Sequence, residues 1–300
     1  MSLAHKVLKN HQLSAVSRFF SASLIRELGR MGYSPMFARL ANESSLLEIA
    51  VPQEPIRKLF DAAFSLMKRK NYRHEYIYKA AITHKVLLGR HSLQTAVLLN
   101  EFRVGSNIAD SIILNGTSTV YEIKSERDSL SRLEQQLCTY RDVFAKVNVI
   151  TGENHLDSVK KMTPDDVGIL LLSDRYQIST YRDAEDLPER TVPEAIFNSI
   201  RLSEAKKVLK IIGREIPKLP NTKMHEALEK EFKTLTPLEA HDGMVRVLRT
   251  SRSMSPLAEF LDALPDSLKT AALSTPLRKQ DHKRLLKAID TPLHEALQWM

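Results

Sequence analysis

Three carboxylates and one lysine stand in a short, otherwise apolar stretch of this 300-residue chain: Glu101, Asp110, Glu122 and Lys124. Charged side chains rarely enter the interior of a sheet unless they are paired or bind a metal ion. Glu122 and Lys124 are two residues apart, so in a strand they project from the same face. We interpret the stretch as a metal-dependent centre that cleaves phosphodiester bonds.

The donor types indicate which metal such a centre would use. Two carboxylates that approach each other repel, and a divalent cation removes that repulsion. Oxygen ligands select Mg²⁺ or Mn²⁺, and the sequence has no Cys/His cluster that would favour zinc. The metal would polarise the phosphate and lower the pKa of a bound water, while Lys124 stabilises the developing negative charge. A buried ion pair without catalytic activity is the alternative interpretation.

The surrounding pattern predicts a mixed α/β sheet. Short β-branched runs alternate with turn residues, and the Asn115-Gly116 pair is a strong hairpin signal that lays Asp110 beside Glu122. A helix is expected over 129–146, and the order of strands and helices indicates a mixed sheet. The expected strands are 95–105, 108–115, 118–124, 147–152, 167–173 and 176–182, with a short helix at 155–162.

Several further side chains are expected to contact the substrate. Gln136 and Tyr140 stand at i and i+4, so they share one face of the expected helix and can approach the site or substrate phosphates. Arg103 shares a strand face with Glu101 and can hold a phosphate or a carboxylate. Ser125 directly follows the Glu-x-Lys pattern, which places it near the phosphates. Cys138 is expected to be a small core residue.

These residues resemble the PD-(D/E)XK nuclease superfamily, which has the restriction-endonuclease-like fold. The resemblance rests on Asp110, a strand–turn–strand that ends in Glu122-Ile123-Lys124, and the helix that follows. More narrowly, the stretch YEIKSERDSLSRLEQQLCTY is similar to an uncharacterised bacterial family of such proteins. The close resemblance covers roughly residues 70–180. Ala109 stands where the superfamily has a proline, a departure that many members tolerate.

The resemblance implies roles for individual residues. Asp110 and Glu122 would be the metal ligands, with the Ile123 carbonyl as a further ligand and Glu101 as an additional acid. Lys124 would be the catalytic lysine. The implied fold is a mixed sheet flanked by helices.

Pattern changes along the chain predict three regions. Residues 1–70 form a helical N-terminal region, 71–183 the nuclease-like core and 194–300 a helical C-terminal region. The segment 183–193 between the last two is charged and interrupted twice by proline, which is typical of a domain boundary. The short C-terminal helices with tight connections also leave room for a helix-turn-helix.

The charge distribution suggests a polyanionic partner. The net charge is +8, distributed as +6 over residues 1–70, −2 over 71–190 and +4 over 191–300. A slightly acidic centre between basic flanks suits a module that binds cations while its neighbours contact nucleic acid. A solvated basic surface without a partner is the alternative.

We therefore expect a Mg²⁺-dependent nuclease that acts on DNA, connected with phage defence or a mobile element. It would act as a homodimer or with a defence-system partner. The alternative is a non-catalytic nucleic-acid-binding or regulatory protein that keeps the nuclease fold. One cysteine excludes an intrachain disulfide and favours the reducing cytoplasm. No apolar run approaches the length of about 20 residues that spans a bilayer, so no membrane partner is expected.

Overall fold

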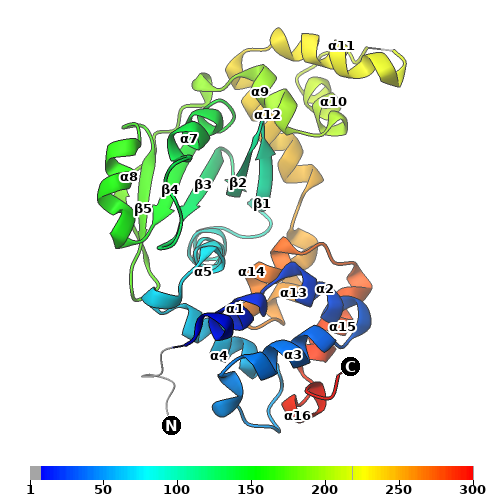
Figure 1. Ribbon diagram of the computed structural model, residues 1–300. Coiled ribbons are helices and arrows are strands. Elements are labelled where there is room, and N and C mark those ends of the chain that lie inside the picture. Colours follow the sequence, from blue (N-terminus) through cyan, green and yellow to red (C-terminus); the bar gives the residue numbers. More distant parts are fainter. Residues whose placement is uncertain (1–7, 218, 300) are drawn as a thin grey trace. The chain divides into compact units, whose positions relative to one another are not determined.

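The computed structural model describes residues 8–217 and 219–299 (Figure 1). The chain divides into two compact units, Met1–Thr83 with Leu257–Met300 and His84–Pro256. This division differs from the three regions expected from the sequence, because helices from the two ends of the chain pack together. The expected C-terminal region is therefore split between the two units.

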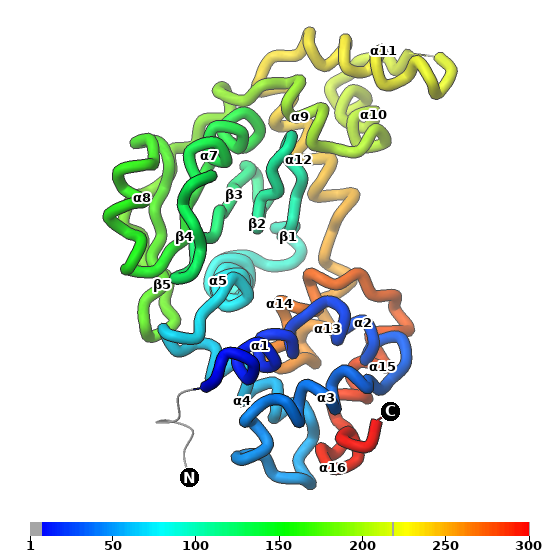
Figure 2. Tube along the Cα trace, in the orientation of Figure 1, coloured from blue at the N-terminus to red at the C-terminus, as the bar shows by residue number. Residues whose placement is uncertain are grey.

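The first unit is all-helical and contains both ends of the chain, coloured blue and red in Figures 1 and 2. Helix α15 packs on α2, and α14 packs on α2 and α4. Apolar residues of these helices face inward, and Leu24, Leu28 and Phe60 are completely buried. Its helices are α1 (Asn10–Arg18), α2 (Ala22–Met31), α3 (Pro35–Glu43), η2 (Leu46–Glu48), α4 (Arg57–Met67), η3 (Lys70–Tyr72), α5 (Glu75–Ala81), α13 (Ala258–Asp262), α14 (Asp266–Ser274), α15 (Lys279–Ile289) and α16 (Leu293–Ala296).

The second unit is built on a six-stranded mixed sheet in the order β1-β2-β3-β4-β5-β6. Strand β2 runs antiparallel to β1 and β3, β4 runs parallel to β3 and β5, and β6 is antiparallel to β5. The prediction of a mixed α/β sheet flanked by helices is confirmed. The strands are β1 (Val97–Val104), β2 (Asn107–Leu114), β3 (Ser118–Lys124), β4 (Lys146–Thr151), β5 (Gly168–Leu172) and β6 (Ile178–Arg182).

Helices complete the second unit by connecting the parallel strands and covering the core. Helix α7 (Leu133–Arg141) connects β3 to β4, and α8 (Leu156–Met162) connects β4 to β5. A single hydrophobic core joins one side of the sheet to α7 and to the later helices. The remaining helical segments are η4 (Ile82–Leu87), α6 (Leu88–Arg90), η5 (Glu153–His155), η6 (Pro188–Arg190), α9 (Pro193–Ser199), α10 (Leu202–Ile211), α11 (Asn221–Lys233), α12 (Pro237–Ser251) and η7 (Ser255–Leu257).

The segment 183–193, expected to be a domain boundary, is fastened to the connections that precede β4 and β5. The Leu187 amide donates to the Ala145 carbonyl at 3.1 Å, and the Val192 amide donates to the Asp142 carbonyl at 2.8 Å. The Arg190 guanidinium forms an ion pair with Asp166. These bonds hold α9–α12 in the same unit as the sheet.

Two local expectations differ from the structure. Helix α7 covers Leu133–Arg141 rather than 129–146, because the chain turns after Asp142 and enters β4 at Lys146. Cys138 is exposed rather than in the core. In the described part of the chain, no helix is both long and apolar enough to cross a membrane.

Candidate active site on strand β3 and helix α7

Glu122 and Lys124 form a buried ion pair at the end of β3. All seven residues of this strand are buried, and Glu122 and Lys124 are 2% and 6% exposed. The Lys124 Nζ atom lies 2.7 Å from Glu122 Oε1, which confirms that the two side chains project from the same face. Two charges removed from water to this extent are stable only while they remain paired.

Helix α7 supplies a partner to each member of the pair. Lys124 Nζ also donates to Gln136 Oε1 at 2.9 Å, and the Tyr140 hydroxyl donates to Glu122 Oε2 at 2.9 Å. Gln136 and Tyr140 thus approach the site from one face of α7, as their spacing indicated. Leu133 and Leu137, which are buried in the same core, hold this face of the helix against the sheet.

Tyr140 acts in this site as a hydrogen-bond donor. Burial, and then the negative charge and hydrogen bond of Glu122, raise the pKa of Tyr140 far above its ordinary value near 10. The phenol therefore keeps its proton. That single proton is shared between Glu122 Oε2 and the Ile108 carbonyl, which lies 3.0 Å from the hydroxyl. The Tyr140 side chain therefore connects α7 to both β2 and β3.

Asp110 reaches the same point of β3 from the neighbouring strand. Its Oδ2 atom accepts a 2.7 Å hydrogen bond from the Ile123 amide, the nitrogen of the peptide bond that follows Glu122. The backbone ladder between β2 and β3 ends at the pair Ser111 and Tyr121. Beyond that pair, the Asp110 side chain accepts the hydrogen bond of the Ile123 amide in place of a backbone carbonyl of β2. The N–H and C=O groups of one strand residue point to the same side, so the Ile123 carbonyl also faces Asp110.

The third expected acid lies opposite Asp110 on an irregular part of β1. The register pairs Asn100 with Ser111 and Phe102 with Ala109, which leaves Glu101 facing Asp110 between two pairs. Glu101 has φ of 55°, a left-handed conformation that is uncommon outside glycine. Such strain in a strand concentrates at functional sites.

Two expected substrate-binding residues lie at the periphery of this cluster. Arg103 is exposed on β1, two residues after Glu101. Ser125 is buried, and its amide and hydroxyl both donate to Asp128 Oδ2, at 2.8 and 2.7 Å. Ser125 therefore closes the turn after β3, and its hydroxyl is directed to Asp128.

A hydrogen-bonded polar pair that the sequence reasoning missed adjoins the site. The Ser111 hydroxyl donates to Asn100 Oδ1 at 2.7 Å, beside the Glu101–Asp110 position. The sequence contains a signal for this pair, because each of two apolar strands carries one polar residue. The hairpin register places these two residues opposite one another.

The side chains that meet here are oxygen donors of the type that a divalent ion such as Mg²⁺ would use. Mg²⁺ usually takes one or two protein carboxylates together with waters and substrate phosphates. Asp110 and Glu122 lie beside the same peptide bond of β3, and each Glu122 oxygen accepts one hydrogen bond and has a second lone pair. Among residues 8–217 and 219–299, no group of three or more His, Cys, Asp and Glu side chains is arranged to hold a metal. Glu101 does not complete a three-acid site.

A second chain of polar groups has the Ser–His–Asp order of a nucleophilic triad, but its serine and histidine lie in the protein interior. Ser118 Oγ lies 2.9 Å from His241 Nε2, and His241 Nδ1 lies 3.1 Å from Asp242 Oδ1. Ser118 is completely buried, His241 is 1% exposed, and the Ser118 hydroxyl also accepts from the Ala145 amide. The Ser118 hydroxyl is held between the His241 ring and the Ala145 amide, so this chain fastens α12 to the sheet.

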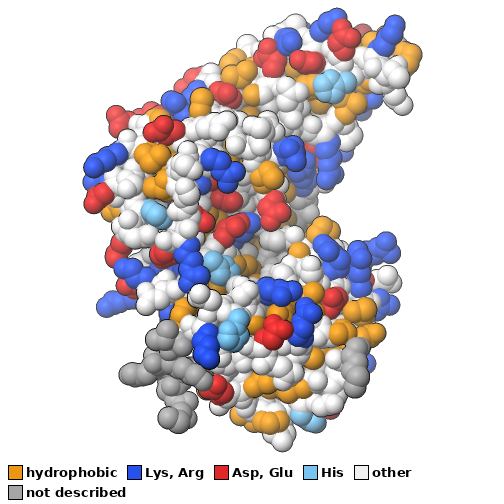
Figure 3. Space-filling view, viewed as in Figure 1, with side chains coloured by type: hydrophobic (Ala, Val, Ile, Leu, Met, Phe, Trp, Pro, Cys, Tyr) orange, Lys and Arg blue, Asp and Glu red, His pale blue; other side chains and the backbone are white. Residues whose placement is uncertain are grey.

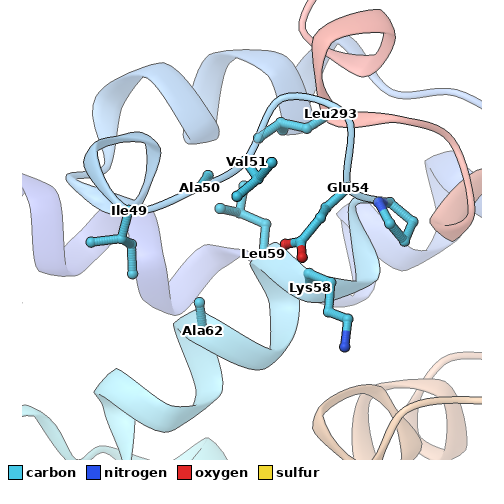
Figure 4. Close-up of a pocket in the computed structure, with 9 residues that line it drawn as sticks. Ile49, Ala50, Val51, Glu54, Lys58, Leu59, Ala62 and Leu293 are labelled. Carbon is cyan, nitrogen blue, oxygen red and sulfur yellow. The ribbon is translucent and has the colours of Figure 1, made fainter. Parts of the chain in front are cut away.

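A pocket of the helical unit, shown in Figure 4, has a different character. Its lining is mainly aliphatic, with Ile49, Val51 and Leu293, and Glu54 is its one acid. It offers no pair of carboxylates. The cluster on β2, β3 and α7 is therefore the candidate active site.

Fold and site together define a mixed α/β protein with a buried carboxylate–lysine centre where a hairpin meets a helix. The family model described as Bacteriophage P4 protein cII matches residues 68–273. Since this match covers more than half of the chain, the protein belongs to that family.

Individual relatives cover less of the chain. Protein cII of Enterobacteria phage P4 is 38% identical over 80 residues, which is 26% of this chain and 30% of that protein. The match thus spans less than a third of the relative. A solved structure of a protein of unknown function from Silicibacter pomeroyi has a TM-score of 0.28 and 17% identity, covering 40% of this chain and 81% of its own. That similarity is too low to support an argument.

Proposed function

We propose that this protein is a metal-dependent phosphodiesterase that cuts DNA. The observation that carries the proposal is the convergence of Asp110, Glu122 and Lys124. The Asp110 carboxylate reaches the peptide after Glu122, and Lys124 Nζ reaches the Glu122 carboxylate. Two acids and a lysine on adjoining strands, with a helix behind them, match the arrangement implied by the PD-(D/E)XK resemblance.

Each group would have a defined task. Asp110, Glu122 and the Ile123 carbonyl would hold Mg²⁺, which supplies polarisation of the phosphate and a water of lowered pKa. Lys124, held by Gln136, places a positive charge where negative charge develops on the phosphate oxygens. Tyr140 keeps Glu122 oriented by donating to its second oxygen.

The charge of the protein supports nucleic acid as its substrate, and its family supports a biological role connected with phages. A net charge of +8 with basic flanks suits a phosphodiester polymer. Membership of the Bacteriophage P4 protein cII family supports a role connected with a phage or mobile element. The assignment to DNA, the cytoplasmic location and a homodimer or defence-system partner remain part of the proposal.

The experiment is a cleavage panel with the purified protein. Supercoiled plasmid, linear duplex, single-stranded DNA and RNA are each incubated with Mg²⁺, Mn²⁺ or Ca²⁺, and with EDTA as the control. We expect nicking or linearisation of DNA with Mg²⁺ or Mn²⁺, and none with EDTA. A substrate range restricted to RNA would correct the substrate, and no cleavage of any polymer with either metal would contradict the proposal.

One observation favours a second candidate, a non-catalytic nucleic-acid-binding or regulatory protein. Both Glu122 oxygens already accept hydrogen bonds from protein donors, so the ion pair is satisfied without a metal. Under this alternative the protein binds nucleic acid but leaves it intact. Equal DNA binding with and without Mg²⁺, together with no cleavage, would favour it.

A further inference from the structure

Helix α15 presents a row of lysines to solvent. Lys279, Lys283 and Lys287 stand at i, i+4 and i+8, so they lie on one face of the helix, and all three are exposed. Arg284, next to Lys283, is also exposed, and its guanidinium donates to the Arg30 carbonyl at the end of α2 at 2.9 Å. Figure 3 shows basic side chains gathered over the segment that joins α14 to α15.

The opposite face anchors α15 to the helical unit. Leu285 and Ile289 are completely buried, and Asp281 accepts from the Arg278 amide at 2.9 Å at the start of the helix. On α2, a Cβ at Gly29 would lie 3.0 Å from Leu277, so the glycine permits close approach of the turn before α15. The helix is thus packed on the unit through its apolar face, with its lysines exposed to solvent.

These lysines have no acidic partner in the part of the chain that the structure describes. In the described ranges, neither an ion pair nor a side-chain hydrogen bond involves Lys279, Lys283 or Lys287. Like charges at i and i+4 destabilise a helix by a few tenths of a kcal/mol per pair. The lysines of α11 differ, since Lys230 pairs with Glu226 at 2.9 Å and Lys233 pairs with Glu229 at 3.2 Å. The uncompensated row on α15 therefore suits an external polyanion.

We propose that α15 is a DNA-contacting helix that binds the phosphate backbone of duplex DNA. It follows α14 after a connection of only four residues, 275–278, which is the connection length of a helix-turn-helix, a motif whose second helix enters the major groove. The major groove of B-form DNA admits a helix, whereas that of duplex RNA is too deep and narrow. A membrane surface is disfavoured because the apolar face of α15 is buried and cannot insert.

The test measures DNA binding by the full chain in EDTA, so that cleavage plays no part and the result is independent of the proposed nuclease activity. Variant one carries Lys279→Gln, Lys283→Gln and Lys287→Gln. The matched control carries Lys223→Gln, Lys230→Gln and Lys233→Gln on α11, which removes the same charge. Fluorescence anisotropy with a short labelled duplex gives the dissociation constant over a range of salt concentrations.

We expect the α15 variant to lose affinity and its salt slope to fall by about 0.9 per lost phosphate contact, roughly 2.7 for three contacts. The control should keep most of the wild-type slope. A variant with three Lys→Arg substitutions on α15 should bind like wild type, which separates loss of charge from misfolding. Equal slopes for the α15 variant and wild type, equal losses in the control, or tighter binding to duplex RNA or anionic vesicles than to DNA would overturn the proposal.

Discussion

Replacing Asp110 by Asn should lower Mg²⁺-dependent DNA cleavage about 10²–10³-fold, the usual loss when one group that stabilises a transition state is removed. The substitution is chosen because the Asn carbonyl oxygen can still accept the hydrogen bond from the Ile123 amide. It therefore removes the charge that would bind the metal and keeps the contact that joins β2 to β3. Cleavage rates of wild type and variant, measured at equal DNA concentration, give the ratio.

The matched control is Asp157→Asn on α8. Asp157 is an exposed acid of the same unit, away from β3 and α7 in the chain. We expect this variant to cleave at the wild-type rate, and both variants to unfold at the wild-type temperature. If Asp110→Asn also retained the wild-type rate, Asp110 would not be a metal ligand.

Replacing Lys124 by Met should destabilise the metal-free protein by about 3–5 kcal/mol, because it leaves the buried Glu122 charge without its cation. For a unit of this size the melting temperature should fall by roughly 6–20 °C. Chemical denaturation in EDTA measures the free energy of unfolding. This instability is also why the lysine variant is less informative than Asp110→Asn as a test of catalysis.

Two companion measurements make the lysine prediction specific. The double variant Glu122→Gln with Lys124→Met removes both charges, so we expect most of the stability to return. Mg²⁺ should stabilise the Lys124→Met protein more than wild type, since the ion no longer competes with Lys124 for Glu122; a concentration of 100 times Kd adds about 2.7 kcal/mol. A single variant as stable as wild type would show that the ion pair is not needed in the fold.

The periodicity of the strands and of the helix was enough to predict which side chains lie together at the candidate site. Spacing two apart placed Glu122 and Lys124 on one face, and the Asn115-Gly116 turn fixed which strand lies beside them. Spacing four apart on the helix placed Gln136 and Tyr140 together. These spacing rules follow from the local geometry of strands and helices, so they do not depend on how the rest of the chain packs.

Features that depend on distant packing were not predictable in the same way. The hydrogen bond from the Ile123 amide to Asp110 arises where the β2–β3 ladder ends, and no local pattern marks that point. The division of the C-terminal helices between two units depends on α15 packing against α2, far apart in the sequence. The sequence predicted that Ser125 contacts a phosphate, but its hydroxyl donates a hydrogen bond to Asp128, three residues later.

The most direct test of the central claim is calorimetric titration of Mn²⁺ and Mg²⁺ into wild type and Asp110→Asn. The claim is that Asp110 and Glu122 form a divalent-metal site beside Lys124. It predicts one site per chain in wild type and binding weakened at least tenfold in the variant, whose Asn keeps the fold but not the charge. Absence of saturable metal binding in wild type, or equal affinity in the two proteins, would contradict the claim and favour the non-catalytic alternative.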